Sequence, residues 1–243
     1  MAKHNTQSLK GLLFDKDGTL IDFDLTWGPA TYEVMREMSA GDDVAFRLLA
    51  ELNHFVVEEK RFLRTSPLVA GTSASYGHLW AQALGRENHP DLHAEMDRRL
   101  REWGLKSMSP IGEPLAVLAE LVADGFRLGI ATNDAEASAL VQAEAMGLVP
   151  HLDFVAGYDS GHGEKPEPGM VLAFAQAIGV EPREVALIGD STHDLHAARA
   201  AGAVAIAVLT GPAPREALEP HADHVVDSIA DLPAYLRRLA AEG

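Results

Sequence analysis

The sequence of 243 residues contains no cysteine, which excludes a disulfide framework and a metal site built from thiolates. It also lacks any apolar run near the ~18 residues that a membrane-spanning helix needs. The opening stretch, MAKHNTQSLK, is polar and has no apolar region of the kind found in a secretory signal. We therefore expect a cytoplasmic protein that has no membrane partner.

Basic residues are scarce: 20 Lys and Arg stand against 36 Asp and Glu, which gives a net charge of −16 at pH 7. Such a chain repels the nucleic-acid backbone, so we expect no nucleic-acid partner. It also repels small phosphoesters at long range. A phosphate site would need a local counter-charge, which a divalent cation and a lysine can supply. The net charge favours solubility and leaves monomer and homodimer open.

Hydrophobic residues make up 47% of the chain, enough for a substantial core. Near the N-terminus, an apolar run that predicts a strand over 11–15 breaks at Asp15, Lys16, Asp17 and Gly18. Loops at the carboxyl ends of parallel strands are where ligands bind. Two carboxylates one residue apart can share a divalent cation, and one of them can act as a nucleophile. The alternative reading is a solvated turn.

A second apolar stretch, 126–131, ends in Thr132 and Asn133. Both residue types suit a helix N-cap, and a helical segment follows. A hydroxyl and free backbone N–H groups at a helix start also form an anion site, so capping and anion binding are compatible here.

Two further segments carry charged residues in the same kind of position. Lys165 lies in the loop GHGEKPEPG, where a lysine on its own is usually solvated. The apolar stretch 184–188 leads into Asp190, and Asp194 follows four residues later. A helix cap with a favourable dipole charge explains one such aspartate better than it explains two.

From residue 110 onward strands and helices alternate, which predicts an α/β fold with a parallel, doubly wound sheet. The expected strands cover 11–15, 126–131, 152–156, 184–188, 203–209 and 224–226. The expected helices of this part cover 112–124, 135–146, 168–178, 192–201 and 229–240.

Residues 29–105 show no convincing strand pattern. They favour helices near 30–39, 43–63, 73–84 and 91–103. Within 43–63, apolar residues from Val44 to Val56 recur at helical spacing, which indicates the core of a small helical bundle. We therefore expect residues 1–22 and 106–243 to form the α/β core and residues 23–105 to form an inserted helical cap, with linkers near 22–29 and 104–110.

The ordered set of Asp/Asp, Thr/Asn, Lys and Asp/Asp at four strand ends resembles the haloacid-dehalogenase-like (HAD) hydrolase superfamily. DKDGTL matches its first motif, TN its second, KPEP its third and GDSTHD its fourth. The resemblance covers roughly 9–22 and 106–243. It implies a HAD-like Rossmannoid core, and the chain looks most like the phosphoglycolate-phosphatase-like branch with an inserted helical cap.

The resemblance also implies a role for each motif residue. Asp15 would attack phosphorus and form an aspartyl-phosphate, while Asp17 would exchange a proton with the leaving oxygen and later with water. Asp15, the backbone carbonyl of Asp17, and Asp190 would hold Mg2+, an ion that an all-oxygen set suits. Because Asp17 is an acid, the resemblance favours phosphoester chemistry over dehalogenation, which has no leaving oxygen to protonate.

The remaining motif residues would bind the phosphoryl group or support the site. Thr132, Asn133 and backbone N–H groups near Gly18 would bind phosphoryl oxygens. Lys165 would offset the charge that builds up on the transferred group. Asp194 would orient Lys165 or the water shell of the metal as a second layer of contacts.

Three positions fall outside the motif pattern. Lys16 replaces the aromatic residue common in the phosphatase branch, and strand alternation predicts that its side chain points away from Asp15 and Asp17. A buried or interfacial ion pair is then as reasonable as a functional role. Substrate choice should come from the cap, where Arg61 and Arg64 are candidates, although a solvated surface is the default for both.

Three functions remain open at this point. The favoured one is a Mg2+-dependent phosphatase for a small phosphorylated metabolite, with phosphoglycolate as the first substrate to try. The second is a sugar-phosphate mutase of the β-phosphoglucomutase type, which shares the core and the cap. The third is a non-catalytic HAD-fold protein that binds a phosphorylated ligand or a protein partner.

Overall fold

The structure is a computed structural model that describes residues 9–69, 71–87 and 89–241, so most of the polar opening stretch lies outside it. It divides into two compact units, one made of residues 1–22 and 110–243 and the other of 23–109. The second boundary lies at 109/110, whereas the sequence suggested 105/106. Each unit has a hydrophobic core of its own.

The larger unit is built on a parallel sheet of six strands in the order β5-β4-β1-β6-β7-β8. Its strands are β1 (Gly11–Phe14), β4 (Arg127–Ala131), β5 (Phe154–Ala156), β6 (Val185–Gly189), β7 (Val204–Val208) and β8 (His224–Val226). Every residue of β1, β6 and β7 is buried, as continuous apolar runs covered on both faces require. The predicted fold class is confirmed.

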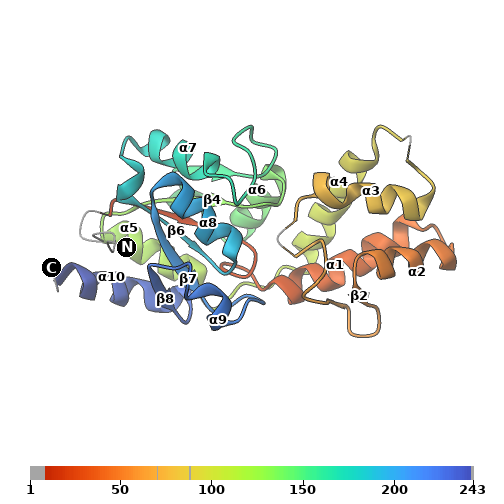
Figure 1. Cartoon of the computed structure of the whole chain (residues 1–243), viewed down its shortest axis with the longest axis horizontal. Helices are drawn as coiled ribbons and strands as arrows, with labels where there is room; N and C mark the ends of the chain where they lie inside the picture. The colour runs from red at the N-terminus through yellow and green to blue at the C-terminus, as the bar shows by residue number, and fades with distance from the viewer. Residues whose placement is uncertain (1–8, 70, 88, 242–243) are drawn as a thin grey trace. The chain divides into compact units, whose positions relative to one another are not determined.

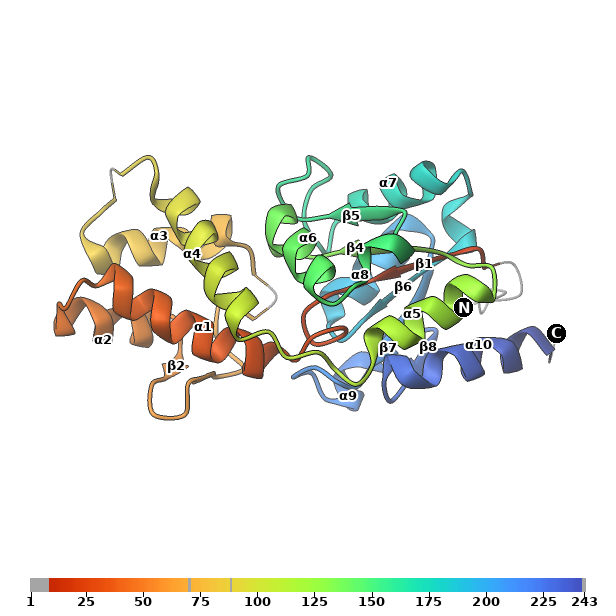
Figure 2. The ribbon, with the colours of Figure 1, turned by 180° about the vertical axis from the view of Figure 1, so that it is seen from behind.

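Two layers of helices cover the sheet, and the strands lie between them (Figures 1 and 2). The helices are α5 (Pro114–Ala123), α6 (Glu136–Ala145), α7 (Gly169–Ile178), α8 (Thr192–Ala201), α9 (Arg215–Leu218) and α10 (Leu232–Ala241). Short turns of 3-10 helix occupy Val149–His151, Pro182–Glu184 and Ile229–Asp231. Apolar residues of α5 and α10 pack on one face, and those of α7 and α8 pack on the other. Helices thus cover both faces of the sheet, so a ligand site is expected at the ends of the strands and not on a face.

The smaller unit consists of α1 (Phe23–Met38), α2 (Asp43–Leu52), α3 (Ser73–Leu84) and α4 (Leu92–Lys106), with a hairpin of β2 (Phe55–Val56) and β3 (Arg61–Phe62). Its core surrounds the fully buried Trp80, whose indole N–H donates to the side chain of Asn53 at 2.9 Å. No helix in the described part of the chain, in either unit, combines the length and hydropathy of a bilayer span.

Two expectations for the smaller unit were wrong. The helix expected over 43–63 ends at Leu52, because Asn53 turns back to donate to the Leu49 carbonyl at 2.7 Å and His54 takes a left-handed φ of 48°. Val44, expected in the core, is 68% exposed.

The linkers expected at 22–29 and 104–110 are largely helical. Helix α1 begins at Phe23 and carries Pro29 inside it, and α4 runs on to Lys106. Proline removes only one backbone hydrogen bond of α1, while Trp27 and Ala30 anchor the helix in the core of the smaller unit.

Candidate active site

The four motifs meet at the carboxyl ends of neighbouring strands. Asp15 follows β1, which lies between β4 and β6 in the sheet. Thr132 follows β4, and Asp190 follows β6. The topology therefore brings together residues that are more than a hundred positions apart in sequence. They meet at the carboxyl ends of the strands, where parallel sheets bind ligands.

The buried ammonium group of Lys165 connects the residues that follow these strands. Its Nζ donates to Asp15 Oδ1 at 2.5 Å, to Asp194 Oδ1 at 2.6 Å and to the Ala131 carbonyl at 3.0 Å. Lysine has three N–H donors, so this set uses all of them. Burial alone would lower the pKa of Lys165, but Asp15 and Asp194 outweigh it and raise the pKa, so the lysine stays charged.

Asp194 is held at both of its carboxylate oxygens. Oδ1 accepts from Lys165, while Oδ2 accepts from the backbone N–H of Ser191 at 3.0 Å and from its hydroxyl at 2.6 Å. Ser191 is the N-cap of α8, so the capping box and the contact with Lys165 share one aspartate. The capping interpretation and the supporting role expected for Asp194 are thus compatible.

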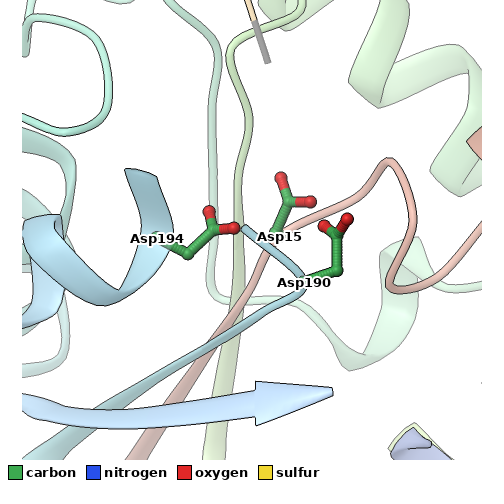
Figure 3. Close-up of side chains that lie close together, drawn as sticks. All are labelled: Asp15, Asp190 and Asp194. Carbon is green, nitrogen blue, oxygen red and sulfur yellow. The ribbon is translucent and has the colours of Figure 1, made fainter. Parts of the chain in front are cut away.

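Three buried carboxylates converge at this point. Oxygen atoms of Asp15, Asp190 and Asp194 all lie within 4.8 Å of one another, and Figure 3 shows the three side chains arriving from β1, β6 and α8. Burial raises the pKa of Asp15 to about 7, because it outweighs the lowering effect of Lys165 and is reinforced by the charges of Asp194 and Asp17. Burial and the charge of Asp15 also raise the pKa of Asp190 well above its usual range. A divalent cation would relieve this crowding of negative charge.

Asp190 lies in a cradle that two glycines leave open. A Cβ placed on Gly18 would come within 2.5 Å of Asp190 Oδ2, and one on Gly211 within 1.7 Å. Gly18 also needs its φ of 86°, and its carbonyl accepts from the Thr210 hydroxyl at 2.6 Å. The backbone thus approaches Asp190 closely from two sides. An all-oxygen donor set with excess negative charge in such a cradle fits Mg2+ or a similar hard cation.

Asp17 and Thr132 lie beside this cluster. The Thr132 hydroxyl donates to Asp17 Oδ2 at 3.3 Å and accepts from the Asp134 N–H at 3.0 Å. Thr132 therefore both caps the turn after β4 and contacts the carboxylate expected to exchange protons. The carboxylate of Asp17 is not part of the three-aspartate cluster, and a contact of its backbone carbonyl with a metal stays a prediction.

Asn133 takes a position that the sequence did not foresee. Its carboxamide donates to the Lys165 carbonyl at 2.9 Å and accepts from the Lys165 N–H at 2.8 Å. Asn133 thereby fixes the backbone of the loop that carries the lysine. Its direct contact with a phosphoryl group stays a prediction.

Lys16 departs from the direction that strand alternation predicted. Its Nζ lies 2.8 Å from Asp17 Oδ2 and 3.1 Å from Asp134 Oδ2, and it donates to Gln142 Oε1 at 2.7 Å. Strand β1 ends at Phe14 and the chain turns at Gly18, so alternation no longer governs residue 16. The ion pair considered for Lys16 is therefore present, and the lysine itself is fully buried. Nothing in the sequence pointed to Gln142, 126 residues away.

The candidate specificity residues belong to the smaller unit. Arg61 is exposed on β3 and pairs with Glu59 at 2.5 Å, and Arg64 is exposed two residues beyond that strand. Both side chains lie at the surface of their own unit, and their part in substrate choice stays a prediction.

Comparison with known proteins agrees with the family that the four motifs resemble. The family model for haloacid dehalogenase-like hydrolases matches residues 9–202. The chain belongs to this family. It is 30% identical to the phosphoglycolate phosphatase of Rhodospirillum rubrum over 233 residues, covering 93% of this chain and 90% of that one. The relationship places it among the hydrolases of the phosphoglycolate-phosphatase-like branch, and its class is that of the phosphatases.

Solved structures show the same fold. A predicted phosphoglycolate phosphatase from Haemophilus somnus matches with a TM-score of 0.66 at 18% identity, over 94% of this chain and 98% of that one. A β-phosphoglucomutase from Clostridium difficile matches with a TM-score of 0.64 at 16% identity, over 96% and 98%. At such identities these two structures speak for the architecture alone.

Proposed function

We propose that this chain is a Mg2+-dependent phosphatase that hydrolyses a small phosphorylated metabolite of the phosphoglycolate type through an aspartyl-phosphate on Asp15. The observation that carries the proposal is the buried pairing of Asp15 with Lys165 at the end of the central strand. A carboxylate and an ammonium in contact, away from water, suit attack on a phosphoryl group and compensation of its charge.

Asp15 would act through its second oxygen. Oδ1 is held by Lys165, and within the described part of the chain Oδ2 accepts no hydrogen bond. Attack by Oδ2 on phosphorus forms the aspartyl-phosphate and breaks the bond to the leaving oxygen. Lys165, fixed by Asp194 and by Asn133, stays beside the reacting carboxylate throughout.

Asp17 would handle the protons. In the first half of the reaction its carboxyl group gives a proton to the leaving oxygen, and in the second half it takes one from the attacking water. That water hydrolyses the aspartyl-phosphate and returns Asp15 to its starting state. The hydroxyl of Thr132 and the backbone N–H groups near Gly18 are the donors we assign to the phosphoryl oxygens.

Mg2+ fits the carboxylate cluster as its counter-ion. The ligands we propose are Asp15, Asp190 and the backbone carbonyl of Asp17. Asp194 would hold Lys165, which in turn contacts Asp15. When bound, the ion would neutralise charge on the phosphoryl group and hold it in line with the attacking oxygen.

The substrate is proposed from relatives and charge. The curated relative from Rhodospirillum rubrum is named a phosphoglycolate phosphatase, which makes that compound the first candidate. A net charge of −16 supports a small ligand over nucleic acid. A cytoplasmic location and a monomeric or homodimeric state complete the proposal.

The test is phosphate release from a panel of phosphorylated metabolites, with Mg2+ and with EDTA. The panel includes phosphoglycolate, sugar phosphates and nucleotides. Asp15→Asn is assayed beside the wild type, and Asp227→Asn serves as a matched control because the side chain of Asp227 is 82% exposed. We expect Mg2+-dependent release that Asp15→Asn abolishes and Asp227→Asn leaves unchanged.

Two outcomes would contradict the proposal. Appreciable activity of folded Asp15→Asn would exclude this residue as the nucleophile. Absence of release from every compound would exclude the phosphatase, and phosphoryl transfer to a sugar phosphate would then identify a mutase.

A further inference from the structure

Lys16 is an ammonium group without any access to solvent. Its exposed fraction is 0%, and it is among the largest fully buried side chains of the described residues. Burying an unpaired charge is very costly, so a buried lysine has to be surrounded by partners. The partners here are Asp17 at 2.8 Å, Asp134 at 3.1 Å and Gln142 at 2.7 Å.

These partners link two parts of the site. Asp17 belongs to the loop after β1, whereas Asp134 follows β4 and Gln142 lies in the buried face of α6. The ammonium contacts both oxygens of Asp17, at 2.9 Å and 2.8 Å, so it restrains rotation of that carboxylate. Thr132 adds a longer contact of 3.3 Å to the same group.

Asp134 gives Lys16 a second acidic partner besides Asp17. Asp17 changes its proton during the proposed reaction, whereas Asp134 takes no part in it. The contacts of Lys16 with Asp134 and Gln142 therefore do not involve the proton that Asp17 exchanges. These two contacts suit a fixed anchor.

We propose that Lys16 is a positioning residue that holds the Asp17 carboxyl group in reach of the leaving oxygen. The inference rests on the proposed function. Lys16 itself gives no proton: as Asp15 bonds to phosphorus and the phosphorus–oxygen bond breaks, the leaving oxygen takes its proton from Asp17. Displacing a reacting group by about 1 Å can cost about a hundredfold in rate.

A purely structural role makes a different prediction. If Lys16 only ties the loop after β1 to α6, its loss would disturb the whole site and slow every substrate alike. If it positions Asp17, its loss would slow formation of the aspartyl-phosphate only for substrates whose leaving oxygen needs a proton. An alkyl phosphate such as phosphoglycolate needs one, whereas para-nitrophenyl phosphate releases a stable anion and does not. Hydrolysis of the aspartyl-phosphate, in which Asp17 takes a proton from water, is a later step shared by all substrates.

The experiment compares kcat/KM of Lys16→Met on these two substrates, because this ratio reports the steps up to departure of the leaving group and does not include the later hydrolysis of the aspartyl-phosphate. Lys10→Met is the matched control, because Lys10 also pairs with an acid, Glu184 at 2.7 Å, but is 60% exposed. We expect kcat/KM on the alkyl phosphate to fall about a hundredfold, and kcat/KM on para-nitrophenyl phosphate to change less than about threefold. Lys10→Met should change neither.

The double variant Lys16→Met/Asp17→Asn tests whether Lys16 acts through Asp17. If Lys16 acts through Asp17, adding Lys16→Met to Asp17→Asn lowers kcat/KM on the alkyl phosphate by less than about twofold further, because coupled residues are not additive. An equal fall on both substrates, or full additivity with Asp17→Asn, would overturn the inference while leaving the phosphatase intact.

A second variant covers the case in which Lys16→Met fails to fold. Gln142→Met keeps every charge and removes only the 2.7 Å acceptor of Lys16. We expect a smaller loss, about three- to tenfold, again confined to the alkyl phosphate. Equal rates for Gln142→Met and wild type on both substrates would overturn the inference. A wild type inactive on both substrates would remove the proposed function itself.

Discussion

The carboxamide of Asn133 and the backbone of Lys165 bind each other reciprocally: the side chain donates to the Lys165 carbonyl at 2.9 Å and accepts from its N–H at 2.8 Å. The two residues lie 32 positions apart in sequence. This pair of bonds fixes the start of the Lys165 side chain, whose far end reaches Asp15. Asn133 therefore influences the nucleophile through Lys165.

Asn133→Ala should lower kcat about ten- to a hundredfold, because small misplacements of a reacting group are costly. Asn133→Asp should fall between wild type and alanine, since it can still accept from the Lys165 N–H but cannot donate to the carbonyl. Steady-state kinetics with a thermal melt on each variant checks this. If Asn133→Ala changes KM alone, then Asn133 acts on substrate binding and not on Lys165.

The strands of the larger unit could be predicted because they lie in mostly apolar stretches bounded by polar residues. Their alternation with helices then predicted a parallel sheet whose carboxyl end carries the motifs, whereas the order of the strands was not predicted. The hairpin of the smaller unit could not be predicted, because β2 and β3 have two residues each and give no measurable alternation. The end of α2 depends on Asn53 bonding to Trp80, a tertiary contact that local pattern does not contain.

The details of the site show the same limit. Residue types at Asp15, Lys165 and Asp190 indicated chemistry, but the partners of Lys16 come from long-range packing. Gln142 is an ordinary glutamine in the sequence, and only the fold turns it toward a buried ammonium. Long-range polar contacts of this kind follow from the fold, and no spacing rule announces them.

Removing the ammonium of Lys165 should be the most damaging single change after loss of the nucleophile. Lys165→Met keeps an unbranched side chain, shorter by one atom, but leaves Asp15 and Asp194 as buried carboxylates without their shared cation. We expect kcat to fall by about three orders of magnitude, comparable to the loss of a donor that stabilises a transition-state charge. Lys10→Met is again the control.

Kinetics and circular dichroism on Lys165→Met together decide the matter. A folded variant whose kcat falls less than about tenfold, roughly 1.4 kcal/mol in the barrier, would show that Lys165 has no catalytic part.

Gly211→Ala should weaken the binding of Mg2+ specifically. Its Cβ would lie 1.7 Å from Asp190 Oδ2, so Asp190 has to move. We expect the Mg2+ concentration for half-maximal activity to rise about tenfold or more, as when a contact that orients a metal ligand is lost. Gly179→Ala is the control, because it has a strained φ of 72° but meets no atom within 4 Å. A change in stability without any change in metal requirement, in both variants alike, would argue against Asp190 as a ligand.

Stability without metal should fall as pH rises toward neutrality. Burial raises the pKa of Asp15 from 3.8 to about 7 and raises that of Asp190 as well. Between about pH 4 and about pH 7 the folded state then binds more protons than the unfolded state, so the free energy of unfolding decreases with rising pH. The site contributes its stability at low pH and has lost it above about pH 7.

Mg2+ should reverse this loss, because it needs the deprotonated carboxylates. At about pH 8 and about a hundred times its Kd, it would add about 2.7 kcal/mol, which corresponds to an increase in Tm of about 5–10 °C for a chain of this size. At about pH 5 the gain should be much smaller, because protons compete for Asp15 and Asp190. Thermal melts in Mg2+ and in EDTA at both pH values, on wild type and Asp190→Asn, measure it. Equal gains at both pH values, or an undiminished gain in Asp190→Asn, would place the cation elsewhere.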